Sequence, residues 1–384
     1  MATAVVENQR QLFRIPDDVT YLNCAYMSPQ LVAVEEAGLE AVKRKSSPWD
    51  IATEDFFEDS ERARSLFARL IGAQADDVAL IPSVSYGIAT AARNILVGAG
   101  EKIVVLAEQF PSNYYMWKVL AEQRGAALRT LAVPADGNWT AALREALTED
   151  VALVAIPQVH WTDGSCIDLE AVGQRCRQIA SALVLDLTQS LGAMPFDVSG
   201  VEPDFIVSAA YKWLLGPYSC GFLYAHPRHH DGTPLEEGWI ARSNSRDFAA
   251  LVNYSDRYHA GARRFDMGER SNFVLLPMAI RALEQVLGWG VENIAATLGR
   301  LNTYLAERAV DAGFEVIASG YKAPHLTGLK VATQDPRALL EALRHAGVYV
   351  SLRGASVRVS PYLYNGNSDI DRLIEVLGAE CPVV

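Results

Sequence analysis

Short apolar runs that alternate with helical periods constrain the fold of this chain most. The runs lie at residues 78–81, 102–107, 151–157, 182–186, 205–209 and 220–224. Helical periodicity fills segments between the earlier runs, at residues 87–97, 113–125 and 168–180. Strands that are apolar on both faces and alternate with helices are typical of a parallel sheet covered on both sides. We therefore expect an α/β fold whose ligand site lies at the carboxyl ends of the strands.

The pattern changes after about residue 226, where a loop-rich stretch precedes long helices, short strands and a last helix. This order predicts a second, smaller α+β domain at the carboxyl end. We expect an N-terminal arm over residues 1–20, a large domain over residues 21–250 and a small domain over residues 251–384.

Charge and composition exclude several classes of protein. Lys and Arg number 34 against 46 Asp and Glu, a net charge of −12, which argues against nucleic acid or an anionic membrane as the main partner. The five cysteines are scattered without a CxxC pair, a pattern that fits reduced thiols and predicts no metal site. Because no apolar run is long enough for a membrane span, we expect a soluble, cytoplasmic protein.

A carboxylate and a lysine follow two of the predicted strands. Asp186 ends the run at 182–186, and Lys212 follows the run at 205–209. Pyridoxal 5′-phosphate chemistry needs such a pair, because a lysine forms the Schiff base and a carboxylate keeps the pyridine nitrogen protonated. The alternatives are a helix-capping aspartate and a surface lysine.

The motifs DLTQ at 186–189 and KWLLGP at 212–217 resemble those of the class V aminotransferases, which are fold type I pyridoxal-phosphate enzymes. The resemblance covers nearly the whole chain. It implies a large domain with a mainly parallel seven-stranded sheet and a smaller C-terminal α+β domain. It also implies that Asp186 pairs with the pyridine nitrogen, that Gln189 bonds the phenolic oxygen and that Lys212 carries the Schiff base.

A strand-to-helix turn at residues 81–87 is the candidate phosphate site. Free N–H groups and the positive end of a helix dipole attract anions, so the Val84 N–H and the Ser85 hydroxyl are candidate phosphate contacts. The alternative is an ordinary helix cap by Ser85.

Further cofactor contacts follow from similarity to kynureninases and isopenicillin-epimerase-like members of the family. The segment EQFPSN implies that Phe110 stacks on the pyridine ring, although a core phenylalanine is the alternative. Tyr211 and Trp239 match phosphate contacts. In the segment MGERSN, Ser271 and Asn272 stand where the family takes a phosphate contact from the neighbouring subunit.

The same similarity suggests the substrate side of the pocket. Arg358, in SVRVSPYLYN, matches the position that binds the substrate α-carboxylate through a guanidinium fork, and Arg353 is a second candidate. Asn23 and Ala25, in YLNCAYMSP, are expected at the substrate end. His160 is a candidate general acid, with a neutral buried histidine as the alternative.

These residues predict an enzyme that uses pyridoxal 5′-phosphate and acts at the α-carbon of a small α-amino acid. The resemblance also implies a homodimer with its active site at the interface. The reaction is either transamination or cleavage at Cβ by a lyase or hydrolase of the kynureninase kind. An amino-acid epimerase and a catalytically silent regulatory protein are the alternatives. Cysteine desulfuration is disfavoured, because the loop before Arg358 reads LRGAS and lacks the family's cysteine.

Overall fold

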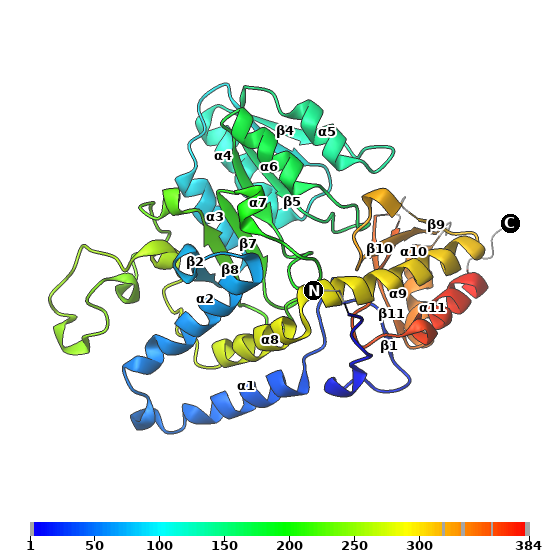
Figure 1. Ribbon diagram of the computed structural model, residues 1–384, viewed down its shortest axis with the longest axis horizontal. Coiled ribbons are helices and arrows are strands. Elements are labelled where there is room, and N and C mark those ends of the chain that lie inside the picture. Colours follow the sequence, from blue (N-terminus) through cyan, green and yellow to red (C-terminus); the bar gives the residue numbers. More distant parts are fainter. Residues whose placement is uncertain (1–3, 317–318, 332–334, 355, 381–384) are drawn as a thin grey trace.

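The computed structural model describes residues 4–316, 319–331, 335–354 and 356–380 of the chain. A seven-stranded sheet forms its centre, and a smaller sheet lies to one side with the last helices (Figure 1). This arrangement confirms the predicted fold: a large, mainly parallel sheet of seven strands followed by a smaller C-terminal α+β unit.

The large sheet has the strand order β2-β8-β7-β6-β5-β3-β4. Strand β8 runs antiparallel to both neighbours, and the other neighbouring pairs are parallel. The strands are β2 (Val78–Ile81), β3 (Lys102–Leu106), β4 (Ala127–Leu131), β5 (Val151–Pro157), β6 (Ala182–Asp186), β7 (Phe205–Ala209) and β8 (Gly221–Ala225).

Two hydrophobic layers cover this sheet, because successive side chains of a strand point to opposite faces. In β6, Val184 packs with the layer of α3 and α4, whereas Leu183 and Leu185 pack with the layer of α2, α5, α6 and α8. The helices of the large domain are α1 (Val32–Arg44), α2 (Glu58–Ile71), α3 (Val84–Asn94), α4 (Tyr115–Arg124), α5 (Trp139–Ala146), α6 (Leu169–Gln178), α7 (Val198–Val201) and α8 (Leu275–Trp289).

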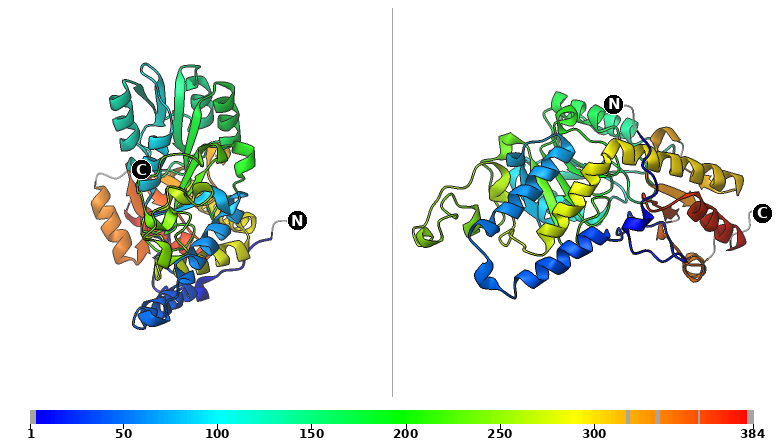
Figure 2. Two further views of the ribbon diagram at one scale, coloured as in Figure 1. Left: turned by 90° about the vertical axis from the view of Figure 1, so that its left-hand side faces the viewer. Right: turned by 60° about the horizontal axis from the view of Figure 1, so that its bottom comes forward.

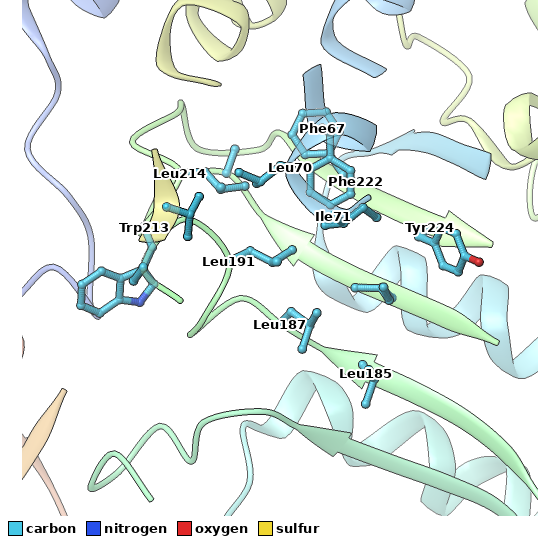
Figure 3. Packing of buried hydrophobic residues seen from close by; sticks show 14 of the residues in the cluster. Phe67, Leu70, Ile71, Leu185, Leu187, Leu191, Trp213, Leu214, Phe222 and Tyr224 are labelled. Atoms are coloured by element: carbon cyan, nitrogen blue, oxygen red, sulfur yellow. The ribbon is translucent and has the colours of Figure 1, made fainter. Parts of the chain in front are cut away.

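Aromatic and leucine side chains fill the layer between α2 and the sheet (Figure 3). Phe67 of α2 stacks on Phe222 of β8 with ring centroids 4.4 Å apart. The same layer continues through Leu187 and Leu191 to Trp213, directly after Lys212. The loops that carry the candidate site residues are therefore anchored in the core.

The smaller sheet has the order β12-β13-β10-β9 and packs against the last helices. A separate parallel pair joins the beginning of the chain to this unit, since β1 (Thr20–Tyr21) pairs with β11 (Val348–Tyr349). The remaining elements are β9 (Glu315–Val316), β10 (Thr327–Lys330), β12 (Ser351–Arg353), β13 (Ser356–Val359), α9 (Val291–Asp311), α10 (Pro336–His345) and α11 (Asn367–Glu380).

Part of the segment assigned from sequence to the small domain packs with the large one. The 3-10 helix at Gly261–Phe265 contacts β2, and α8 lies against α1 and α2. Leu276 and Leu283 of α8 belong to the core of the large sheet. We therefore propose a boundary near Gly290, where α8 gives way to α9, in place of residue 250.

The described part of the chain offers no helix that is long and apolar enough to cross a membrane. Within the same residues, no group of three or more His, Cys, Asp and Glu side chains is placed to hold a metal ion. The cysteines at positions 24, 166, 176 and 220 are all free thiols.

Candidate active site

Two adjoining cavities lie where the sheet strands end. The first has a volume of about 240 Å³ and is lined by residues that follow β2, β3, β5, β6 and β7. The second has a volume of about 250 Å³ and opens between the amino-terminal segment and the small sheet. Both cavities share a wall made of Phe110, Trp161, Tyr211, Lys212 and Tyr218.

Asp186 stands at the end of β6, in the wall of the first cavity. Its Oδ1 accepts a hydrogen bond of 3.0 Å from the Thr188 N–H. Burial raises the pKa of this carboxyl, while hydrogen bonds from Thr188 and the charge of Lys212 oppose the increase. The side chain is thus a buried acid beside a cavity, oriented by hydrogen bonds from Thr188.

Lys212 projects from the turn after β7 and is only 6 % exposed. Its Nζ lies 5.4 Å from the centroid of the Phe110 ring and 5.6 Å from that of Tyr211. Burial lowers the pKa of the amine to about 8, and the positive charges of Arg358 and Arg353 add to the decrease against the opposing effect of Asp186. About a tenth of the amine is therefore neutral at pH 7, far more than for a lysine of ordinary pKa.

The turn after Lys212 is held in an unusual conformation. Leu215 and Ser219 both have positive φ, at 56° and 61°, a region that non-glycine residues seldom adopt. The Gly216 N–H donates to the Ala210 carbonyl oxygen at 2.8 Å, closing the turn. A Cβ on Gly216 would lie 2.8 Å from the Ala210 Cβ, so the close approach needs glycine.

The amino terminus of α3 faces the first cavity. Ser83, not Ser85, caps this helix, since the Ser83 Oγ accepts a 3.2 Å hydrogen bond from the Tyr86 N–H. The Ser85 Oγ lies 3.0 Å from the Ser83 Oγ, and Val84 and Ser85 both line the cavity. Because the first N–H groups of a helix lack partners within the helix, this end suits an anion.

Gln189 connects three parts of the molecule at the base of the first cavity. Its Nε2 donates to the Ala25 carbonyl oxygen at 3.0 Å, and its Oε1 accepts from the Trp213 Nε1 at 3.0 Å. The Gln189 backbone carbonyl accepts a 2.6 Å hydrogen bond from His325 of the small domain. One Nε2 hydrogen remains for a ligand.

Arg358 on β13 is almost completely buried in the wall of the second cavity. Its Nη1 donates to the Trp161 carbonyl oxygen at 2.9 Å, whereas its Nε and Nη2 have no partner among the described residues. Burial lowers the pKa of this guanidinium to about 9, with a further decrease from Arg353. Arg353 lines the same cavity, and its guanidinium lies 5.1 Å from the Trp161 ring centroid.

The other residues predicted on the substrate side differ in their surroundings. Ala25 lines the second cavity. The buried Asn23 accepts a hydrogen bond from the Ser351 hydroxyl at 2.8 Å. The imidazole of His160 stacks on Trp139 and has both nitrogens within hydrogen-bond distance of partners, at the Thr162 hydroxyl and the Ala107 carbonyl. Burial lowers its pKa, so His160 fits the neutral alternative.

Three predicted cofactor contacts lie elsewhere in the single chain, around Phe56. Trp239 packs edge-on against the Phe56 ring, and the Ser271 hydroxyl donates to the Phe56 carbonyl oxygen. Asn272 Oδ1 accepts from the N–H groups of Val274 and Leu275 at the start of α8. The described residues that line the two cavities do not include Trp239, Ser271 or Asn272.

Tyr218 is a cavity residue that the sequence motifs did not identify. It lines both cavities, and its ring lies 4.6 Å from that of Tyr211 between centroids. The available signal was its place directly after Gly216 and Pro217, in the turn that carries Lys212.

The first cavity fits pyridoxal 5′-phosphate on its own geometry. A buried acid, a buried amine of lowered pKa and the amino terminus of α3 face one space, with an aromatic ring beside the amine. These groups match the pyridine nitrogen, the aldehyde, the phosphate and the flat ring of the cofactor.

Comparison with known proteins agrees with this fit. The sequence pattern of the family described as aminotransferase class-V matches residues 42–373. An uncharacterized aminotransferase of Bacillus subtilis (strain 168), YcbU, is 27% identical over 97% of this chain and 98% of its own length. A kynureninase of Geobacillus thermodenitrificans is 24% identical over 86% of this chain and 79% of its own length.

Solved structures share the fold over nearly the whole chain. The apo structure of a cysteine desulfurase from Thermococcus onnurineus NA1 matches with a TM-score of 0.84 and 20% identity, covering 98% of each chain. The cystine C-S lyase C-DES, in complex with its product cysteine persulfide, matches with a TM-score of 0.85 and 18% identity. It covers 95% of this chain and 99% of its own.

Proposed function

This chain belongs to the class V aminotransferase family of pyridoxal-phosphate enzymes, and from that premise we propose that it transforms small α-amino acids at Cα, with Lys212 as the catalytic amine. The observation that carries the proposal is the convergence of Lys212, Asp186 and Arg358 on two adjoining cavities. Each supplies a different chemical need, and Lys212 lies in the wall between the cavities.

The chain's own residues would divide the work as follows. When bound, pyridoxal phosphate supplies an electron sink for the bonds at the Cα of an amino acid. Asp186 and the first N–H groups of α3 would hold the pyridine nitrogen and the phosphate, and Phe110 would lie against the ring. Arg358 receives the α-carboxylate through its unpaired Nε and Nη2. Lys212, with its pKa near 8, takes and returns a proton at Cα.

Transamination and Cβ cleavage both begin with these steps, and both stay within the proposal. Similarity to an aminotransferase supports the first, and similarity to kynureninases supports the second. Cysteine desulfuration needs a reactive thiol, but burial raises the pKa of Cys24 well above its usual value and that of Cys220 to about 12. Such thiols are weak nucleophiles.

The test is the visible spectrum of the purified protein with pyridoxal phosphate, recorded before and after each amino acid of a panel. Products are identified by mass spectrometry. We expect a cofactor band that changes with a small set of amino acids, and Lys212→Ala should abolish turnover and the borohydride-reducible link between cofactor and protein. A keto acid identifies an aminotransferase, and a Cβ fragment identifies a lyase or hydrolase.

Other outcomes would overturn the proposal in different ways. Inversion at Cα without a keto acid or a fragment would identify an epimerase. A band without turnover of any amino acid would point to a regulatory protein. A borohydride-stable cofactor adduct on another lysine would remove Lys212 from its assigned role.

A further inference from the structure

The second cavity carries an excess of positive charge. Its lining includes Lys212, Arg353 and Arg358, and no acidic side chain from the described part of the chain. Asp186 belongs to the lining of the first cavity. One substrate α-carboxylate can neutralise one guanidinium, so a second cation remains without a counter-charge.

The register of β12 and β13 places Arg353 and Arg358 on the same face of the small sheet. In the antiparallel pair of β12 and β13, Ser351 lies opposite Arg358 and Arg353 lies opposite Ser356. Opposed residues share a face of the sheet, and so do residues two apart on one strand. Arg353 and Arg358 are therefore diagonal neighbours on one face, about 7–8 Å apart at Cα and within reach of each other for long side chains.

Neither guanidinium has a carboxylate partner within 4.0 Å among the described residues. Arg353 donates through Nη1 to the Leu352 carbonyl oxygen at 2.7 Å, but its buried Nε is unpaired, as are Nε and Nη2 of Arg358. Both lie near the Trp161 ring, at 5.1 Å and 6.0 Å from its centroid. Two like charges with unpaired donors in one cavity are costly unless an anion joins them.

We propose that the substrate is an α-amino acid with a second carboxylate, and that Arg353 binds this side-chain group while Arg358 binds the α-carboxylate. The assignment of Arg358 to the α-carboxylate rests on the proposed function. Arg353 lines the substrate cavity and not the first one, where α3 is placed to hold the phosphate. Arg353 is thus a specificity residue for the side chain of the substrate.

Binding of unreactive acids to the holoenzyme tests the inference without any turnover. Glutarate, a dicarboxylate, is compared with pentanoate, a monocarboxylate of equal chain length, by titration calorimetry. We expect glutarate to bind about tenfold more tightly or better, because it gains a second charge-assisted contact. Arg353→Gln should remove this preference, because it should weaken the binding of glutarate much more than that of pentanoate. Arg358→Gln should weaken the binding of both.

Two further variants test whether the charge of Arg353 and its position in the cavity are what matter. Arg353→Lys keeps the charge and should retain part of the preference for glutarate. Arg69→Gln removes an exposed arginine on α2 and should change neither affinity. Equal affinity of the holoenzyme for the two acids would overturn the inference, and so would an equal loss of both in Arg353→Gln, which would make Arg353 a second contact of the α-carboxylate.

Amino-acid kinetics separate this inference from the proposed function. If the inference holds, kcat/KM favours aspartate or glutamate over asparagine or glutamine, and Arg353→Gln reverses the order through KM. A glutarate preference without turnover of any amino acid would contradict the proposed function alone. Turnover confined to neutral amino acids, without a glutarate preference, would contradict the inference alone.

Discussion

Burial determines the chemistry of the charged side chains in the two cavities. It is the largest cause of the lowered pKa values of Lys212 and Arg358 and of the raised pKa of Asp186. Each shift favours the neutral form, because a charge in a poorly hydrated site loses solvation. Buried ionisable side chains of this kind reduce the stability of the protein without ligand. They are typical of ligand-binding and catalytic sites.

Replacing Lys212 with methionine should therefore stabilise the apoprotein. The folded-state pKa of Lys212 is about 8, below its ordinary value of 10.5, so the wild type loses stability as the pH falls from 10.5 to about 8. Below that window Lys212→Met should raise the free energy of unfolding by about 2–4 kcal/mol. Urea unfolding of both proteins over a pH series measures the difference.

The gain should vanish at strongly alkaline pH, where the lysine is neutral in both states. Lys118→Met, on the exposed surface of α4, serves as the matched control and should change stability by no more than about 0.5 kcal/mol. A gain that is independent of pH would mean that side-chain packing, and not the buried charge, explains the stabilisation.

Arg358 should also affect the pKa of the Lys212 amine. Its positive charge lowers the pKa of Lys212, so Arg358→Gln should raise that pKa from about 8, by on the order of one unit. Because only the neutral amine attacks the cofactor aldehyde, the pH at which cofactor uptake reaches half its maximal rate should move upward. Stopped-flow absorbance of apoprotein mixed with pyridoxal phosphate follows this rate. Arg358→Lys keeps the charge, and a matching shift in that variant would show that charge is not the cause.

Local motifs identified a group of candidate cofactor residues that lie together in the structure. The structure brings the predicted residues of the DLTQ and KWLLGP motifs, the α3 turn and Phe110 to the lining of a single cavity. Each of them directly follows a sheet strand, so strand prediction was sufficient to place them. Trp239, Ser271 and Asn272 follow no sheet strand and do not line the cavity. For Ser271 and Asn272 the family resemblance implies a contact with the cofactor of the neighbouring subunit.

At the level of elements, apolar content decided which strands were predictable. The six predicted runs correspond to β2, β3, β5, β6, β7 and β8. Strand β4 was missed because Ala127, Arg129 and Thr130 are exposed at the sheet edge, where it pairs with β3 alone. An edge strand has no need of the continuous apolar run that marks a central one.

The position of helix α3 determines where the candidate phosphate site lies, so moving the helix should change the binding of the cofactor. A Cβ on Gly87 would lie 2.5 Å from Val207 Cγ1 and 2.8 Å from Ile81 Cδ1. Gly87→Val should therefore push α3 away from the sheet, destabilise the protein by about 1–3 kcal/mol and weaken binding of pyridoxal phosphate. Fluorescence titration of the apoprotein measures the affinity.

Comparing the affinities for pyridoxal phosphate and for pyridoxal, which lacks the phosphate, distinguishes displacement of α3 from a general loss of structure. The advantage of pyridoxal phosphate over pyridoxal should shrink in Gly87→Val, since only the phosphate contacts the terminus of α3. Gly378→Ala on α11, where no atom lies within 4 Å of the added Cβ, should leave both affinities unchanged. Parallel losses for both compounds would contradict a role of α3 in phosphate binding.

At the level of the whole molecule, we propose that the expected homodimer forms through an exposed face on and just after α1. Helix α1 runs along the lower edge of the molecule in Figure 1 and comes forward in the right-hand view of Figure 2. Leu39, Val42 and Trp49, on and just after this helix, are 58 %, 58 % and 79 % exposed. Large exposed apolar side chains are typical of protein interfaces. The sequence alone could not show this face, because nothing distinguishes it from a core-facing helix until the fold is known.

If the dimer shares its sites, two inactive chains should restore activity when mixed. Ser271→Asp places a negative charge where the family similarity expects a phosphate contact from the neighbouring subunit, and Lys212→Ala removes the amine. In a mixed dimer, one of the two sites then combines Lys212 of one chain with Ser271 of the other. Random reassortment makes half of the dimers mixed, so activity should return to roughly a quarter of the wild-type value. Sedimentation confirms the dimer, and activity that stays absent in verified mixed dimers would place Ser271 and Lys212 in sites of the same chain.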